Sequence, residues 1–148
     1  KPIDAASYRS LSKEEAAKVL LNEAMVQTDG GSWERIAVGR VYYLGGMKPE
    51  GQAIFDEVIA GEDASDLLRV ARVYSEAGEW TLARPLYDEA IRMEPKEEVW
   101  LAEVGAQYLL NGDRETAEAL FDRSFKRNEE LWATVNAAGA YLGVKPQE

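Results

Sequence analysis

The chain has 148 residues, of which 46% are hydrophobic, and this composition is enough for one core of modest size. It contains no Cys and no His, which excludes disulfides, zinc-finger sites and thiol chemistry from this chain, and no apolar run is long enough for a transmembrane helix. The formal net charge of -10 repels phosphate backbones, so nucleic acid is not an expected partner.

Start and stop signals divide the chain into short helices. Ser12 and Glu15 form a capping box, and Ser32 and Asp113 are predicted caps of the helices that follow them. Gly78 and Gly112 suit the residue after a helix end, where positive φ is often needed. No stretch alternates as a strand does, so the predicted fold class is all-α. The predicted helices cover residues 3–10, 13–28, 32–45, 48–60, 64–77, 80–93, 97–111, 114–127 and 130–143.

A unit of about 34 residues recurs along these predicted helices. Gly46, Gly78 and Gly112 lie 32 and 34 residues apart, and two aromatic positions keep the same intervals. One unit cannot bury its apolar stripe alone, whereas stacked units share a core. The aromatic positions are Tyr42, Tyr74 and Tyr108, and Phe55, Tyr87 and Phe121.

This pattern of recurring glycine, aromatic and small apolar positions resembles the tetratricopeptide repeat (TPR) family. The resemblance implies a right-handed α-solenoid of tandem helix-turn-helix hairpins, which forms a single domain over residues 1–148. Its copies would cover residues 1–31 in part, then 32–63, 64–97 and 98–131, with a terminal capping helix at 132–143. The middle copy carries the resemblance most clearly, through Leu67, Val70, Ala71, Tyr74, Gly78, Ala83, Tyr87, Ala90 and Pro95.

What the resemblance implies for function is protein–protein interaction, commonly in assembly, secretion or envelope complexes. A peptide or helix of a partner protein would bind a concave groove lined by the first helix of each hairpin. Arg40 and Arg72 occupy the same slot of adjacent copies and could together hold a carboxylate of the partner. The competing interpretation is that Arg72 pairs with Glu76, one turn later. The predicted groove residues are Trp33, Ile36, Arg40, Tyr43, Leu44, Leu68, Arg72, Glu76, Ala106, Leu109 and Leu110.

No active-site motif stands out from the sequence. A P-loop, a dinucleotide fingerprint, a nucleophile elbow and a metal-ligand cluster are all missing. Carboxylates are plentiful, yet those at Asp56, Asp88 and Asp122 recur with the repeat, which indicates a solvated face. We therefore expect a binding module that is not an enzyme and uses no cofactor and no metal.

The terminal helix leaves alternatives open. Its predicted inner stripe is Trp132, Val135, Ala138, Tyr141 and Leu142, and its predicted outer face is Ala133, Asn136, Ala137 and Ala140. Trp80, Trp100 and Trp132 are predicted to pack between neighbouring units, while Trp33 could pack or bind. This helix either caps the solenoid or, if its outer face is apolar, docks onto another copy in a homo-oligomeric structural protein.

A third function is a regulatory arm of a longer enzyme. The chain begins Lys1-Pro2 without an initial Met, which leaves a removed leader or an upstream region open. Cytoplasmic and exported or periplasmic locations both stay open.

Overall fold

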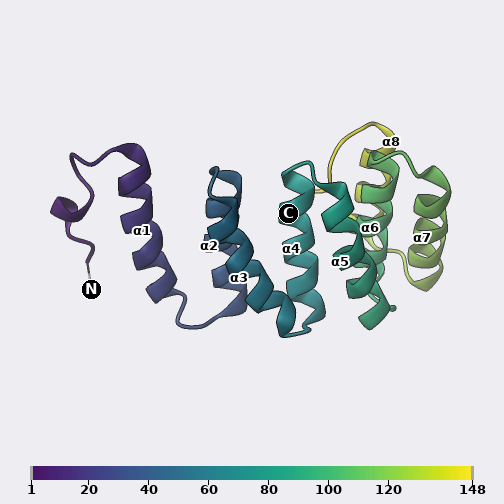
Figure 1. Cartoon of the computed structure of the whole chain (residues 1–148). Coiled ribbons are helices and arrows are strands. Elements are labelled where there is room, and N and C mark those ends of the chain that lie inside the picture. Colours follow the sequence, from purple (N-terminus) through teal and green to yellow (C-terminus); the bar gives the residue numbers. More distant parts are fainter. Residues whose placement is uncertain (1, 148) are drawn as a thin grey trace. The chain divides into compact units, whose positions relative to one another are not determined.

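The computed structural model describes residues 2–147, and over this range the chain is all-α, with eight α-helices and no strand (Figure 1). The fold class predicted from sequence is therefore confirmed at this level. The backbone divides into two compact units, Lys1–Gly61 and Glu62–Glu148. The single continuous domain stays a prediction.

The first unit contains a short 3₁₀ helix, Ala5–Ser7, and three α-helices. These are α1 (Lys13–Gln27), α2 (Ser32–Leu44) and α3 (Lys48–Ala60). Only three residues of the predicted helix 3–10 are helical. Helices α2 and α3 form a hairpin: a Cβ at Gly39 would lie 2.7 Å from the Phe55 ring, so only glycine allows this approach.

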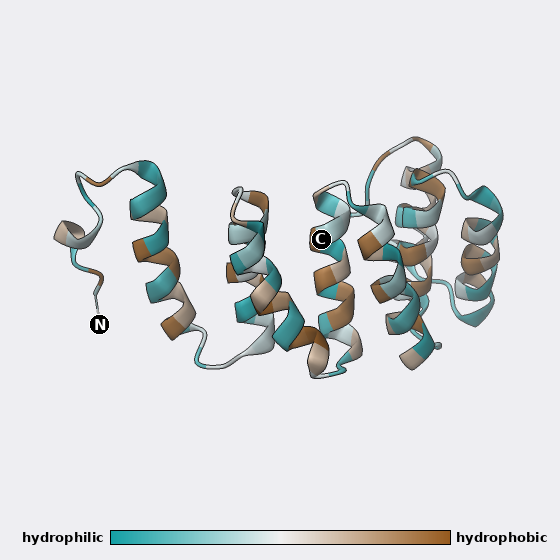
Figure 2. Cartoon of the chain, viewed as in Figure 1, coloured by the Kyte–Doolittle hydropathy of each residue, from teal (hydrophilic) through white to brown (hydrophobic). Residues whose placement is uncertain are grey.

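The second unit contains two hairpins and one further helix. The hairpins are α4 (Ala64–Glu76) with α5 (Trp80–Met93) and α6 (Glu98–Leu110) with α7 (Arg114–Arg127). Helix α8 (Leu131–Tyr141) packs closely along α6 (Figure 1). Hydrophobic residues recur along each helix between hydrophilic ones, as expected for amphipathic helices (Figure 2).

Helices α2, α4, α6 and α8 all end in the same turn. Each is followed by a glycine with φ between 76° and 92°. The residue after that glycine donates its N–H to a carbonyl oxygen five residues earlier, which is the Schellman motif. The glycines are Gly46, Gly78, Gly112 and Gly143, and the donors are Met47, Glu79, Asp113 and Val144, with distances of 2.8, 2.9, 2.9 and 2.8 Å.

Polar side chains cap several helix starts, as predicted. The Ser12 Oγ accepts from the Glu15 N–H at 3.2 Å, and an Asp113 oxygen accepts from the Thr116 N–H at 3.1 Å. Hydrogen bonds from Thr116 hold the pKa of Asp113 below its ordinary value. Ser32 is not a cap, because α2 already begins at this residue and the N-cap is Gly31, which has no side chain to accept a hydrogen bond.

The predicted inner stripe of α8 is wrong. Ala133, Ala137 and Ala140, with 1%, 4% and 5% of their surface exposed, are the buried residues of this helix. Trp132 is 60% exposed and Val135 is 47% exposed. The small alanine side chains allow α8 to approach α6 closely, and the large apolar side chains are left outside.

Candidate functional site

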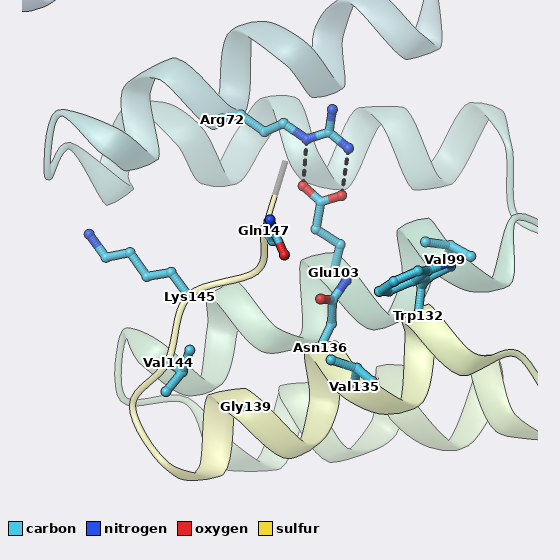
Figure 3. A pocket seen from close by; sticks show the side chains of 10 residues that line it. All are labelled: Arg72, Val99, Glu103, Trp132, Val135, Asn136, Gly139, Val144, Lys145 and Gln147. Carbon is cyan, nitrogen blue, oxygen red and sulfur yellow. Dashed lines mark hydrogen bonds and ion pairs between the residues drawn. The ribbon is translucent and has the colours of Figure 1, made fainter.

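A cavity of about 570 Å³ lies between α4, α6 and α8 of the second unit. Figure 3 shows Arg72 of α4 and Glu103 of α6 facing each other at this cavity, with Trp132, Val135 and Asn136 projecting from α8. Apolar side chains therefore surround a charged pair, a combination typical of binding sites. We call this cavity and its lining residues the groove.

The charged pair is bidentate. The Nε and Nη2 atoms of Arg72 donate to the two carboxylate oxygens of Glu103, each at 2.7 Å. The side chain of Glu103 is only 6% exposed and that of Arg72 is 25% exposed, so water screens the pair weakly. Next to it, the Ser75 Oγ donates to Gln107 Oε1 at 2.7 Å. These two links fix the spacing of α4 and α6.

The pair changes both interpretations of Arg72. From the sequence, the acid expected beside Arg72 is a partner carboxylate or Glu76, and neither interpretation includes Glu103 of α6. Because Glu103 engages the Nε–Nη2 edge of the guanidinium group, a partner carboxylate would have to displace Glu103 to bind that edge. Arg72 therefore positions the walls of the groove in this conformation.

The residues after α8 run along the groove. The Val144 N–H donates to the Gly139 carbonyl oxygen at 2.8 Å, and a Cβ built on Gly139 would lie 3.6 Å from the Cβ of Val144. Lys145 and Pro146 border a second cavity of about 190 Å³, beside Ser75 and Gln107. The segment Val144–Gln147 thus narrows the groove (Figure 3).

Two tyrosines hold the helices around the groove. The Tyr108 hydroxyl donates to Asp88 at 2.7 Å, and its ring meets Trp80 edge to face at 5.0 Å, which joins α6 to α5. Burial, together with the bond to Asp88, raises the pKa of Tyr108. The Tyr141 hydroxyl donates to Glu118 at 2.5 Å and joins α8 to α7, and this bond raises the pKa of Tyr141.

The predicted groove residues fall into two groups. Ile36, Tyr43, Leu68 and Ala106 are buried, so their side chains belong to the core and offer no surface to a partner. Helices that pack on both sides bury more of their circumference than one apolar stripe, which explains why a first-helix position need not face a groove. The exposed or partly exposed residues are Trp33, Arg40, Leu44, Arg72, Glu76, Leu109 and Leu110.

The structure brings together only some of the predicted residues. Arg72 lines the groove, and Glu76 borders the second cavity. Arg40 belongs to the first unit and Arg72 to the second, so the paired arginine clamp stays a prediction. Trp80 packs on Tyr108 of the next hairpin, as expected, whereas Trp132 is exposed and does not pack between hairpins.

Sequence reasoning missed most residues of the groove, among them Glu103 of α6 and Trp132, Val135 and Asn136 of α8. Trp132, Val135 and Asn136 lie 11, 8 and 7 residues before the closing Gly143. The same distances before Gly78 and Gly112 mark large or small apolar residues on α4 and α6. Counted from the closing glycine, these α8 residues are equivalent to residues that α4 and α6 bury under their second helices, so this count alone does not mark them as groove residues.

Neither a protein-family model nor a curated protein matches the chain. Over residues 2–147, no group of three or more acidic side chains is arranged to hold a metal ion. Within the same range, every helix is too short or too polar to cross a membrane.

Proposed function

We propose that the chain is a non-enzymatic protein-interaction scaffold of the TPR type, a right-handed solenoid that binds a peptide or helix of a partner protein. The groove of the second unit is the binding surface. One observation carries this proposal: the cavity of about 570 Å³ combines exposed apolar side chains with a charged pair at its wall. The repeated hairpins and their glycine turns support the TPR assignment.

The energetics favour the apolar part of the groove as the source of affinity. Trp132 and Val135 are largely exposed, so a partner that covers them removes apolar surface from water. Aromatic residues are also enriched among those that dominate binding energy. The Arg72–Glu103 pair already satisfies its own charges and contributes shape and specificity instead.

Affinity capture from the native source tests this function. Wild-type chain is compared with Val135→Glu, which places a charge in the groove without disturbing the core, because Val135 is half exposed. The matched control is Leu82→Glu on α5, since Leu82 is 45% exposed and does not line the groove. We expect Val135→Glu to lose a protein that wild type and Leu82→Glu both retain. Equal capture by all three would contradict the proposal.

A second candidate function is self-association through the terminal helix. Large apolar side chains on α8 and at its end are exposed: Leu131, Trp132 and Leu142 are 64%, 60% and 82% exposed. An exposed patch of this kind often marks an interface. Light scattering separates the two candidates, because a monomer at high protein concentration argues against a homo-oligomer.

A further inference from the structure

In the hairpins, α5 covers one side of α4 and α7 covers one side of α6. The groove side of α8 holds the equivalent positions, counted back from the closing glycine. The positions 11, 8, 7 and 4 residues before the closing glycine define this side. On α4 and α6 each of these residues is buried, with at most 8% exposure where a value is given. They are Leu67, Val70, Ala71 and Tyr74 on α4, Leu101, Val104, Gly105 and Tyr108 on α6, and Trp132, Val135, Asn136 and Gly139 on α8.

The second helices meet this side with a pattern of their own. A small residue is followed four residues later by an aromatic one, and three residues later by another small one. The aromatic side chain sits on the position seven residues before the glycine: a Cβ at Gly105 would lie 2.8 Å from the Phe121 ring. The pattern is Ala83, Tyr87 and Ala90 on α5, and Ala117, Phe121 and Ser124 on α7, all buried.

Within residues 2–147 no second helix covers this side of α8, and Val144, Lys145 and Gln147 lie along it. Trp132 and Val135 are exposed, and Asn136 and Gly139 are partly exposed. The helix carries no charged residue from Leu131 to Tyr141, so nothing on it opposes an apolar neighbour. Helix α8 therefore resembles the first helix of a hairpin and ends in the same glycine turn. The side that a second helix would cover faces the groove instead (Figure 3).

We propose that the groove binds an amphipathic α-helix of a partner protein, and that this helix carries the small-x₃-aromatic-x₂-small pattern of α5 and α7. The inference rests on the proposed function and adds the conformation and side-chain pattern of the bound segment. Asn136 leaves less room than Gly105, so the aromatic residue of the partner lies beside Asn136 and over Gly139, where Val144 lies in the structure. The small residues on either side let the two helix backbones approach closely.

The charged wall adds a polar requirement. The Arg72–Glu103 pair and Asn136 border the same cavity, so the partner helix presents a polar or charged residue on that flank. Val144, whose side chain lies against Gly139, shifts when the helix binds, whereas its backbone bond to Gly139 belongs to the turn and is retained.

The probe is a capped synthetic peptide with the sequence of residues 113–127, which contains α7 and its Asp113 cap. It is titrated onto the whole chain, and NMR shifts of the Trp132 indole and of Val135 are followed. The matched probe carries Phe121→Ala. Because an isolated helix of this length is marginal in water, both peptides are also made with a lactam bridge on the solvent-facing side.

We expect saturable binding of the native peptide, at least about tenfold weaker binding of the Phe121→Ala peptide, and loss of binding by Val135→Glu chain. Leu82→Glu chain is expected to bind like wild type. The proposal is overturned if the bridged native peptide does not saturate the shifts at millimolar concentration, or if Phe121→Ala binds equally well. It is also overturned if a scrambled, proline-containing peptide binds as tightly, because the groove would then take an extended segment.

The proposed function and this inference can fail separately. If Val135→Glu loses a captured partner but no helical peptide binds, the groove binds a partner in another conformation and only the inference fails. If capture is unaffected by Val135→Glu, both fail. If the chain forms a dimer that Val135→Glu dissociates and the peptide does not bind, a second copy occupies this side of α8, which also overturns the inference.

Discussion

Helices α6 and α8 end in the same glycine turn, yet α6 buries large and small side chains whereas the buried residues of α8 are all alanines. Helix α6 packs against α7 and α8, contacts α5 and is linked to α4 by side-chain hydrogen bonds, and it buries large residues such as Leu101 and Val104. Helix α8 buries Ala133 and Ala137 against α6 and exposes Trp132. The turn therefore defines where a first helix ends, and the presence of a covering helix decides which of its faces is inside.

The comparison also shows why small residues matter in this fold. A buried alanine stripe brings the α8 backbone close to α6, and dispersion contacts then replace the burial of larger side chains. The large apolar side chains outside, such as Trp132, would still release free energy if another surface removed them from water. The difference between α6 and α8 leads to four testable predictions.

Removal of an aromatic ring should lower the free energy of unfolding much more beside α6 than on α8. Phe121→Ala empties the space against Gly105 and should lower the free energy of unfolding by about 3–5 kcal/mol. Trp132→Ala removes a ring that is mostly exposed and should change it by about 0.5 kcal/mol. Chemical denaturation of both variants measures this. Similar costs for the two would show that Trp132 is covered in solution.

The ion pair of α6 should matter more than an exposed pair elsewhere. Glu103→Ala removes the bidentate partner of Arg72, and we expect a cost of about 2–3 kcal/mol, less than for a fully buried pair because Arg72 is partly exposed. The control is Asp122→Ala, which breaks the exposed pair with Lys126 and should cost about 0.5 kcal/mol. If Glu103→Ala costs as little as the control, the pair does not hold α4 to α6.

The closing glycines of α6 and α8 can be compared directly. Nothing lies within 4 Å of a Cβ built on Gly112 or Gly143, so an alanine there is opposed only by the positive φ. Gly112→Ala should cost about 1–2 kcal/mol. Gly143→Ala should cost less, because only the packing of Val144 on Gly139 depends on that turn. Thermal unfolding measures both, and a larger cost at Gly143 would show that the segment after α8 stabilises the unit.

The smallest expected effect concerns the cap of α7, which depends on pH. Asp113→Ala should destabilise the chain slightly at neutral pH, because it removes the N-cap hydrogen bond to Thr116. Hydrogen bonds from Thr116 lower the folded-state pKa of Asp113 below 3.8. The stabilisation is therefore complete above pH 3.8 and is lost as the pH falls through the lower folded-state value. Denaturation at several pH values should show the two proteins converging in acid, and a constant difference would contradict this account.

Local signals made the helices predictable from sequence. The range 64–77 was predicted and Ala64–Glu76 is observed, and 114–127 agrees with Arg114–Arg127. Caps such as Asp113 and stops such as Gly112 act within one turn of the helix, so no knowledge of distant residues is needed.

The groove was less predictable because its geometry is not local. Glu103 lies 31 residues from Arg72, and the pair forms only when α4 and α6 are set at one spacing. The two stripes of α8 both recur with the helical period, so the sequence could not decide between the stripe with Trp132 and the stripe with Ala137. Only the packing of α8 on α6 decides it.

The repeated turn has a consequence for how this chain could change in length. Each turn is held by a glycine and by backbone hydrogen bonds alone, so it requires no specific side chain on either neighbour. The block from Glu79 to Gly112 thus brings its own stop at Gly112 and opens directly after the stop at Gly78. Such a block is a natural unit for duplication or excision, because the junction it leaves behind is the same turn that was there before.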